Sequence, residues 1–313
     1  MIRNRSGAAL RCVLAAMAML ALGAGAAHAE TILFVGNSFT YGANSPVWKY
    51  RAGTVSDLNG TGVGGVPALF KLFTQEAGRD FTVSLETVGG MDLGFHLREK
   101  SHLVIQRWDH VILQGYSTLD EQRPGDPAAL IRDSATFAQL LHDRNPAVDI
   151  RLSATWSRAD QTYPQTGHWY GRSIKAMARD VRAGCDQAKA NSPLIRAVIP
   201  IGDAWNLAFD TGFADTNPYD GIEAGKVDLW TYDAYHASAL GYYLEALTIF
   251  GSVTGLDPRS LGANEVAAAE LGLSRPQTVA LQQLAHDALA GQRPEARQKR
   301  TQSNAPPIRV ARR

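Results

Sequence analysis

The chain has 313 residues, of which 45% are hydrophobic and 19% are charged, with 29 glycines and 14 prolines. This composition excludes a wholly disordered, collagenous or coiled-coil protein. Its 31 basic and 30 acidic residues leave a net charge of +1, so no overall basic excess points to nucleic acid as a partner.

The first 29 residues have the pattern of a secretory signal peptide. Arg3, Arg5 and Arg11 form a positive start, an apolar stretch follows, and small residues end the segment at Ala29. The apolar stretch is diluted by alanine and glycine and is short for a membrane span. We therefore predict cleavage after Ala29, export to the periplasm or the medium, and no stable membrane span in the mature protein.

From Thr31 onward, short apolar runs alternate with helical patterns. The runs typical of strands buried on both faces are Thr31–Val35, Phe81–Val88, His110–Leu113, Ile150–Thr155 and Ile195–Ile201. The helical patterns span Val66–Ala77, Leu93–Gln106, Ala128–Leu141, Ser173–Ala190, Ser238–Val253 and Pro276–Leu289. This alternation predicts βαβ units, and hence one α/β domain over residues 30–291. We expect a three-layer α/β/α sandwich around a five-stranded parallel sheet.

Two segments break this pattern. Tyr41–Gly65 is rich in glycine and serine, follows the first strand directly and has no clear period. Loops of this length in compact domains are usually functional or mobile. The end of the chain, 292–313, is basic and contains three prolines but no aromatic residue, so we predict a disordered tail.

The residues that carry chemistry follow the predicted strands, and ligands of an open parallel sheet bind beyond the carboxyl ends of its strands. Ser38 follows the first strand, and a serine hydroxyl needs a base before it becomes a good nucleophile. His236 can serve as that base, and Asp233, three residues earlier, can orient it. Gly90 follows the second strand, where a glycine N–H can approach a developing oxyanion closely.

These motifs, in this order, resemble those of the SGNH/GDSL hydrolase superfamily. The matching segments are ILFVGNSFTYG around Ser38, ETVGGMDL around Gly90, and YDAYHASALGYYLEAL around Asp233 and His236. The resemblance implies a flavodoxin-like strand order and hydrolysis of esters by a serine nucleophile, without a cofactor or metal. It also implies small acyl groups, such as acetyl, on a carbohydrate or another alcohol, and an oxyanion held by the N–H groups of Ser38 and Gly90.

One block departs from the family pattern of Gly-x-Asn-Asp, in which the asparagine donates to the oxyanion. Here LQGYS places Tyr116 in the asparagine position, and Gln114 carries an amide two residues earlier. Either Gln114 or Tyr116 can replace the donor, and the sequence does not choose between them. The departure favours an alternative function on the same fold. In that alternative, the chain is an envelope protein that binds glycans and either lacks catalytic activity or transfers acyl groups.

Other candidates have simpler interpretations. His96 can reach the pocket rim but is more typical of helix packing, and Trp156 can stack on a sugar or fill the core. Asp228 is an alternative partner for the catalytic histidine, at a less natural spacing. Gly60–Gly65 fits the dinucleotide pattern GxGxxG, but no strand is predicted before it. Cys185 is interpreted as a small buried helix residue, and no cluster of cysteine and histidine suggests a metal.

Overall fold

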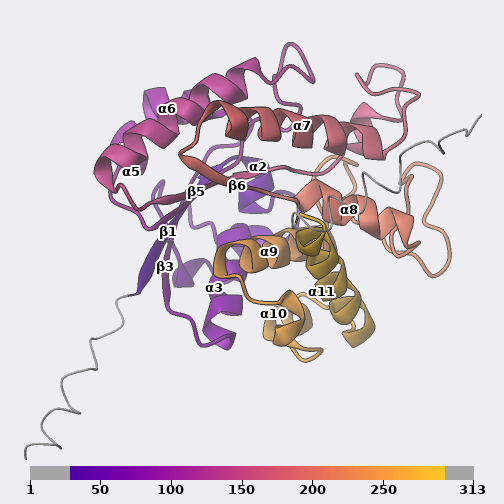
Figure 1. The fold of residues 1–313 in the computed structure, drawn as a ribbon. Coiled ribbons are helices and arrows are strands. Elements are labelled where there is room, and N and C mark those ends of the chain that lie inside the picture. The colour runs from indigo at the N-terminus through magenta and orange to yellow at the C-terminus, as the bar shows by residue number, and fades with distance from the viewer. Residues whose placement is uncertain (1–28, 293–313) are drawn as a thin grey trace, which may run out of the picture.

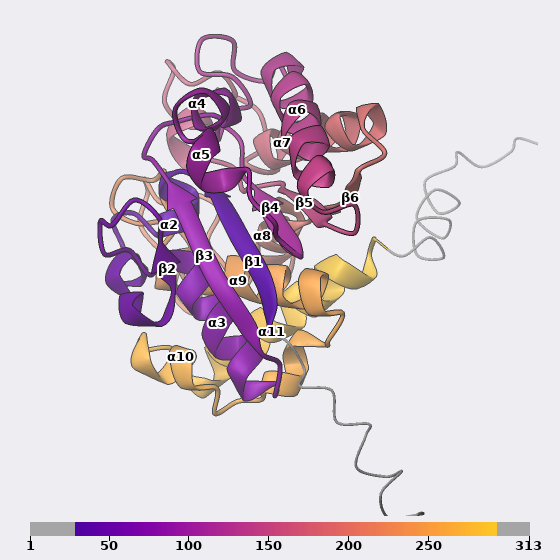
Figure 2. The ribbon, with the colours of Figure 1, turned by 90° about the vertical axis from the view of Figure 1, so that its left-hand side faces the viewer.

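A parallel six-stranded sheet forms the centre of the protein. The structure is a computed structural model that describes residues 29–292. The strands are β1 (Glu30–Gly36), β2 (Ser56–Asp57), β3 (Phe81–Thr87), β4 (His110–Leu113), β5 (Asp149–Ser153) and β6 (Ile195–Ile199). Their spatial order is β2-β3-β1-β4-β5-β6, with all neighbours parallel (Figure 2). Without β2 this is the flavodoxin-like order, whose switch point lies between β1 and β4.

Helices cover both faces of the sheet (Figure 1). One layer contains α3 (Gly65–Glu76), α8 (Ile201–Asp210), α9 (Ala239–Thr254) and α11 (Arg275–Ala290). The other contains α4 (Leu93–Glu99), α5 (Ser101–Val104), α6 (Ala128–Arg144) and α7 (Lys175–Asn191). Two short helices, α2 (Ser38–Tyr41) and α10 (Val266–Glu270), and four 3₁₀ turns complete the described chain. The architecture is the predicted three-layer α/β/α sandwich.

Each face of the sheet has its own hydrophobic core. In β1, Ile32 and Phe34 pack toward α3 and α9, whereas Leu33 and Val35 pack toward α4, α6 and α7. All four side chains are fully buried. Burial on both faces explains why this strand is a continuous apolar run and does not alternate with polar residues.

The sheet has six strands where five were expected. The extra strand, β2, pairs only Ser56 with Ser84 and Asp57 with Leu85 at the edge of β3, and two residues are too few to show a period. The helical pattern at Leu93–Gln106 is two helices. α4 ends at Glu99 because the backbone of the next residue, Lys100, leaves the helical region at φ −123° and ψ 7°.

Both predicted terminal segments lie largely outside the described residues. Of the proposed signal peptide, residues 1–28 are not described, and of the proposed basic tail, residues 293–313 are not described. Between residues 29 and 292, no helix has the length and apolar character needed to cross a membrane.

Candidate active site

Ser38 lies on a tight turn at the carboxyl end of β1. It is the first residue of α2, and Asn37 caps that helix by accepting the N–H of Phe39 at 3.2 Å. The Asn37 side chain also donates from Nδ2 to the carbonyl oxygens of Met91 (3.0 Å) and Gly115 (3.3 Å). One amide therefore joins the turns that follow β1, β3 and β4.

Gln114 supports the same turn from beneath. Its Oε1 accepts the backbone N–H of Asn37 at 2.9 Å and the hydroxyl of Thr40 at 3.2 Å, and its Nε2 donates to the carbonyl of Gly115. The side chain is buried. A Cβ at Gly36 would collide with Thr40 Oγ1 and Gln114 Oε1, so only glycine fits where the strand meets the turn.

Asp233 and His236 share one turn before α9. Asp233 Oδ1 accepts the N–H groups of Tyr235 (3.0 Å) and His236 (2.9 Å) and the hydroxyl of Thr231 (2.9 Å), while Oδ2 lies 2.6 Å from His236 Nδ1. Ala234 adopts φ +54°, which allows the chain to fold back. Burial alone would raise the pKa of Asp233, but the bonds from the His236 side chain and from these N–H and hydroxyl donors hold that pKa well below its ordinary value.

Asn44 connects the segment after Ser38 to this pair. Its Nδ2 donates to Asp233 Oδ2 at 2.7 Å and lies 3.4 Å from His236 Nδ1. Its backbone is in the left-handed region at φ +58°, which asparagine tolerates better than most residues. Asn44 is separated from Asp233 by 189 positions and belongs to no motif, so sequence reasoning missed it.

The same edge of the sheet brings Ser38 and His236 into one neighbourhood. The Phe39 ring lies 5.9 Å from the imidazole of His236, and the hydroxyl of Tyr242 donates to the carbonyl of Ser38 at 3.2 Å. His236 Nε2 is buried and has no hydrogen-bond partner within residues 29–292. The nitrogen that would take a proton from serine is thus uncommitted.

Two backbone N–H groups near Ser38 are also uncommitted. Neither Ser38 N nor Gly90 N donates to an acceptor in the described part of the chain. Gly90 has φ +73° in a turn closed by the bond from Met91 N to the Val88 carbonyl at 3.3 Å. The positive φ favours glycine at this position.

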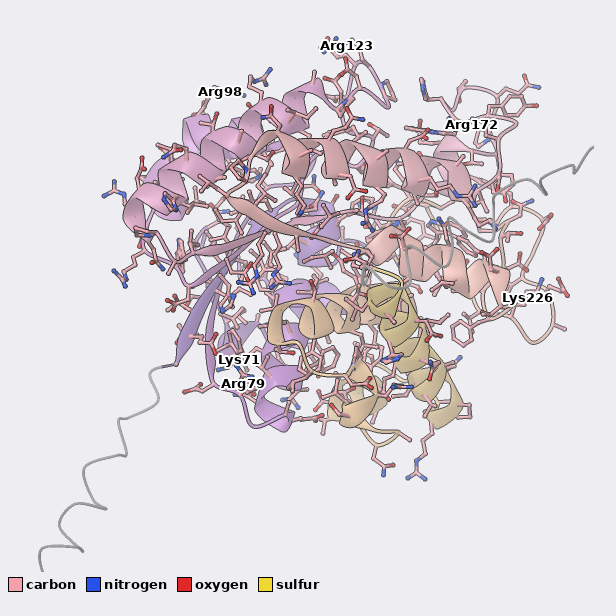
Figure 3. All side chains as sticks on the ribbon, in the orientation of Figure 1. Lys71, Arg79, Arg98, Arg123, Arg172 and Lys226 are labelled. Carbon is pink, nitrogen blue, oxygen red and sulfur yellow. The ribbon has the colours of Figure 1, made fainter. Side chains whose placement is uncertain are left out.

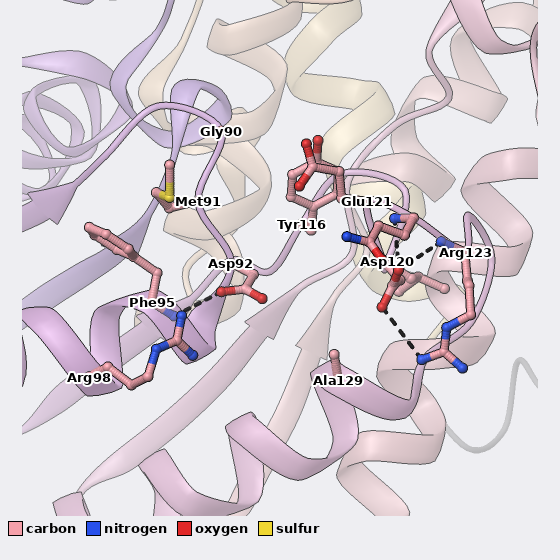
Figure 4. Close-up of a pocket in the computed structure, with 12 residues that line it drawn as sticks. Gly90, Met91, Asp92, Phe95, Arg98, Tyr116, Asp120, Glu121, Arg123 and Ala129 are labelled. Atoms are coloured by element: carbon pink, nitrogen blue, oxygen red, sulfur yellow. Dashed lines mark hydrogen bonds and ion pairs between the residues drawn. The ribbon is translucent and has the colours of Figure 1, made fainter.

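A cleft of about 390 Å³ opens beside Gly90 and Tyr116 (Figure 4). Its wall comes from the turn before α4, from α4, from the loop after β4 and from the start of α6. Its charged lining residues are Asp92, Arg98, Asp120, Glu121 and Arg123. Arg98 and Arg123 extend from the periphery of the molecule (Figure 3). Burial and the nearby Glu121 carboxylate raise the pKa of Tyr116.

Two of the aromatic candidates lie in the core. His96 is fully buried, and its Nδ1 pairs with the carboxylate of Glu86. Trp156 is also fully buried and stacks on Phe39, with ring centroids 4.1 Å apart. Both side chains therefore pack in the core, and Trp156 supports Phe39, the residue that follows Ser38.

The remaining alternatives do not reach the site. Asp228 accepts the N–H of Trp230 at 2.8 Å, whereas the carboxylate bonded to His236 belongs to Asp233. Gly60–Gly65 follows only the two-residue strand β2, not the strand that a dinucleotide fingerprint requires. Cys185 is buried, which raises the pKa of its thiol to about 12. Across residues 29–292, no group of three or more histidine, cysteine, aspartate or glutamate side chains could hold a metal ion.

Comparison with known proteins finds similarity in structure only. No protein-family model and no curated protein matches the chain. A DUF4886 family protein from Bacteroides uniformis has a TM-score of 0.60 and 18% identity, over 84% of this chain and 95% of that one. A putative GDSL-like lipase from Parabacteroides merdae has a TM-score of 0.50 and 16% identity, over 72% of this chain and 95% of that one. At these identities the comparisons establish that this chain shares its fold with those two proteins.

Proposed function

We propose that the protein is a serine ester hydrolase of the SGNH type. Ser38 Oγ attacks the ester carbonyl while His236 Nε2 takes the hydroxyl proton, and Asp233 holds the imidazole and stabilises its charged form. Collapse of the tetrahedral intermediate breaks the ester C–O bond, and His236 returns the proton to the leaving alcohol. Water, activated by the same histidine, then hydrolyses the acyl-serine and releases the carboxylic acid.

One observation carries this proposal. His236 is bonded through Nδ1 to a carboxylate at 2.6 Å, while its buried Nε2 has no partner in the described part of the chain. His96 shows the same pattern, with Nδ1 paired to Glu86 and a buried Nε2 that has no partner among the described residues, but its side chain is enclosed in the core. His236 differs because its side chain is 12% exposed, at the sheet edge that carries Ser38. The carboxylate fixes the tautomer in which Nε2 is the base, and Ser38 lies at the same sheet edge.

The oxyanion is assigned to the N–H groups of Ser38 and Gly90. Gln114 already accepts two bonds and donates to Gly115, so its contacts favour a supporting role. Tyr116 lines the cleft beside Gly90 and is the better side-chain candidate for the third donor.

Gly90 and Tyr116 line the cleft, whereas Ser38 and His236 do not. We infer that the cleft adjoins the reacting centre and holds a hydrophilic alcohol as the leaving group. Its charged side chains, of both signs, can bond to hydroxyl groups, and the rings of Phe95 and Tyr116 can lie against a sugar. We infer removal of a small acyl group, such as acetyl, from a carbohydrate or similar alcohol. The signal-like residues 1–29 suggest that the substrate is met outside the cytoplasm.

The test is hydrolysis of p-nitrophenyl acetate by the purified protein beside its Ser38→Ala variant. A fluorophosphonate probe, mapped by peptide mass, identifies the reactive serine independently. Turnover and labelling should both disappear in Ser38→Ala. Activity that survives this substitution would exclude Ser38 as the nucleophile. Labelling at Ser38 with turnover only when an alcohol acceptor is added would identify an acyltransferase.

A further inference from the structure

A guanidinium, a phenol ring and the catalytic imidazole are stacked at the edge of the site. The Cζ of Arg158 lies 3.5 Å from the centroid of the Tyr235 ring. On Tyr235, the His236 imidazole stacks with a centroid distance of 4.0 Å and an interplanar angle of 27°. Tyr235 and His236 are adjacent in the chain, whereas Arg158 lies 77 positions before Tyr235, so the stack joins the loop after β5 to the loop before α9.

Arg158 is held from two directions. Its Nε and Nη2 donate to the two carboxylate oxygens of Asp160 at 3.0 and 2.7 Å, and Nη1 donates to Ser117 Oγ at 3.1 Å. Its side chain is only 11% exposed. Each guanidinium nitrogen donates to a protein group, so Arg158 is held firmly against Asp160 and Ser117. A bidentate fork of this kind is a property of arginine that lysine does not share.

The hydrogen bond to Asp233 leaves one motion of His236 unconstrained. A bond at Nδ1 fixes a point on the ring, but the ring can still turn about the Nδ1–Oδ2 line. Turning would move Nε2 away from Ser38. A flat ring packed on one face of the imidazole opposes that turn, and Phe39, tilted at 5.9 Å, borders the imidazole as well.

We propose that Arg158 is a positioning residue for His236 and acts through the Tyr235 ring. The guanidinium fixes Tyr235 in place, and Tyr235 fixes the plane of the imidazole whose Nε2 must meet the serine hydroxyl. This role rests on the esterase function proposed above. It assigns the loop after β5 to the catalytic apparatus, although no residue of that loop belongs to the sequence motifs.

The kinetic test compares Arg158→Met with Arg151→Met. Arg151 is a matched control, because it forms the same kind of bidentate pair, with Asp149, and its side chain is 10% exposed. Misplacement of a reacting group by about 1 Å can cost about 10²-fold in rate. We expect Arg158→Met to lower kcat for p-nitrophenyl acetate by about 10- to 100-fold with little change in KM, while Arg151→Met keeps kcat at a temperature where it is folded.

Variants of Tyr235 keep the test decisive if Arg158→Met does not fold. Tyr235→Phe retains the ring and should stay within about twofold of the wild type, whereas Tyr235→Leu should lose as much kcat as Arg158→Met. Arg158→Lys keeps the charge but not the fork, so it should behave like the methionine variant. Full kcat in Tyr235→Leu, or in a folded Arg158→Met, would overturn the proposal.

A readout without substrate separates this inference from the proposed function. A tyrosine ring stacked on an imidazole shifts the imidazole C–H resonances upfield. His236→Asn identifies the resonance by its disappearance. In Arg158→Met, the His236 resonance should move toward the position that it has in Tyr235→Leu. In Arg151→Met, it should stay at its wild-type position. If the wild type hydrolyses no ester but the resonance moves as expected, the esterase function fails and the positioning contact stands. An unmoved resonance refutes the contact.

Discussion

Replacement of Gln114 by alanine tests how the turn that carries Ser38 is held. The substitution removes the acceptor shared by the Asn37 N–H and the Thr40 hydroxyl. These residues are only 3% and 4% exposed, so bulk water does not readily replace the lost partner. A buried group left without a partner costs about 1–3 kcal/mol, so the free energy of unfolding should fall by about 2–5 kcal/mol. For a domain of this size that lowers Tm by roughly 10 °C.

The same substitution should lower kcat by about tenfold or more, because the turn that carries Ser38 loses its support. Urea denaturation measures the stability change, and hydrolysis of p-nitrophenyl acetate measures kcat. Thr40→Val removes one of the two bonds and should lower the free energy of unfolding by about half as much. The double variant Gln114→Ala/Thr40→Val should be little less stable than Gln114→Ala alone. This account of the turn would be refuted if the free energy of unfolding of Gln114→Ala lay within about 1 kcal/mol of the wild-type value and kcat were unchanged.

Three further predictions concern single side chains. Asn44→Ala should lower kcat by about tenfold with KM unchanged, because Asp233 loses a charge-assisted bond; steady-state kinetics checks this. Gly90→Ala and Gly78→Ala both place a Cβ in open space at φ +73° and +67° and should each cost about 1–2 kcal/mol, but only Gly90→Ala should also lower kcat. Burial raises the pKa of Glu245 well above its ordinary value. As pH rises, the unfolded state therefore loses the Glu245 proton before the folded state does. The free energy of unfolding should fall by up to about 1.4 kcal/mol per pH unit above about pH 4.3. Glu245→Gln should remove that pH dependence, measured by urea denaturation between pH 5 and 8.

The strands and the contact between Asp233 and His236 could be predicted because their signals are local. The strand His110–Leu113 has the predicted bounds, since a parallel strand buried on both faces is a short apolar run that polar residues end. The pairing of Asp233 with His236 follows from three-residue spacing within one turn. The fold class followed in turn from the alternation of strands and helices.

The contacts that complete the site are not local and could not be predicted in this way. Asn44 meets Asp233 across 189 positions, and Arg158 meets Ser117 across 41. An asparagine in a glycine-rich loop and an arginine after a strand are both ordinary on their own. What makes them part of the site is the order of the strands, which brings the loops after β1, β4 and β5 to one edge.

The Asn37 side chain links the turn after β1 to the loops that follow β3 and β4. Asn37 stands where Gly-Asp-Ser has aspartate, and its Nδ2 donates to the carbonyls of Met91 and Gly115, the glycine of the LQGYS segment. A carboxylate at this position has no hydrogen to donate and would face two carbonyl oxygens in a buried site. This turn therefore requires an amide, given the loop that follows β4.

Asn37→Asp tests that link. Near neutral pH the substitution should lower the free energy of unfolding by about 2–5 kcal/mol, because two buried carbonyls lose their donor. A protonated carboxyl can donate again, and burial against carbonyl oxygens favours that form. The folded variant should therefore hold its proton to higher pH than the unfolded chain, whose aspartate ionises near pH 3.9. The stability deficit should then grow as pH rises from about 4 to 7 and shrink as pH falls. A deficit that is the same at pH 4 and pH 7 in urea denaturation would show that the donated hydrogens of Asn37 are not what the turn needs.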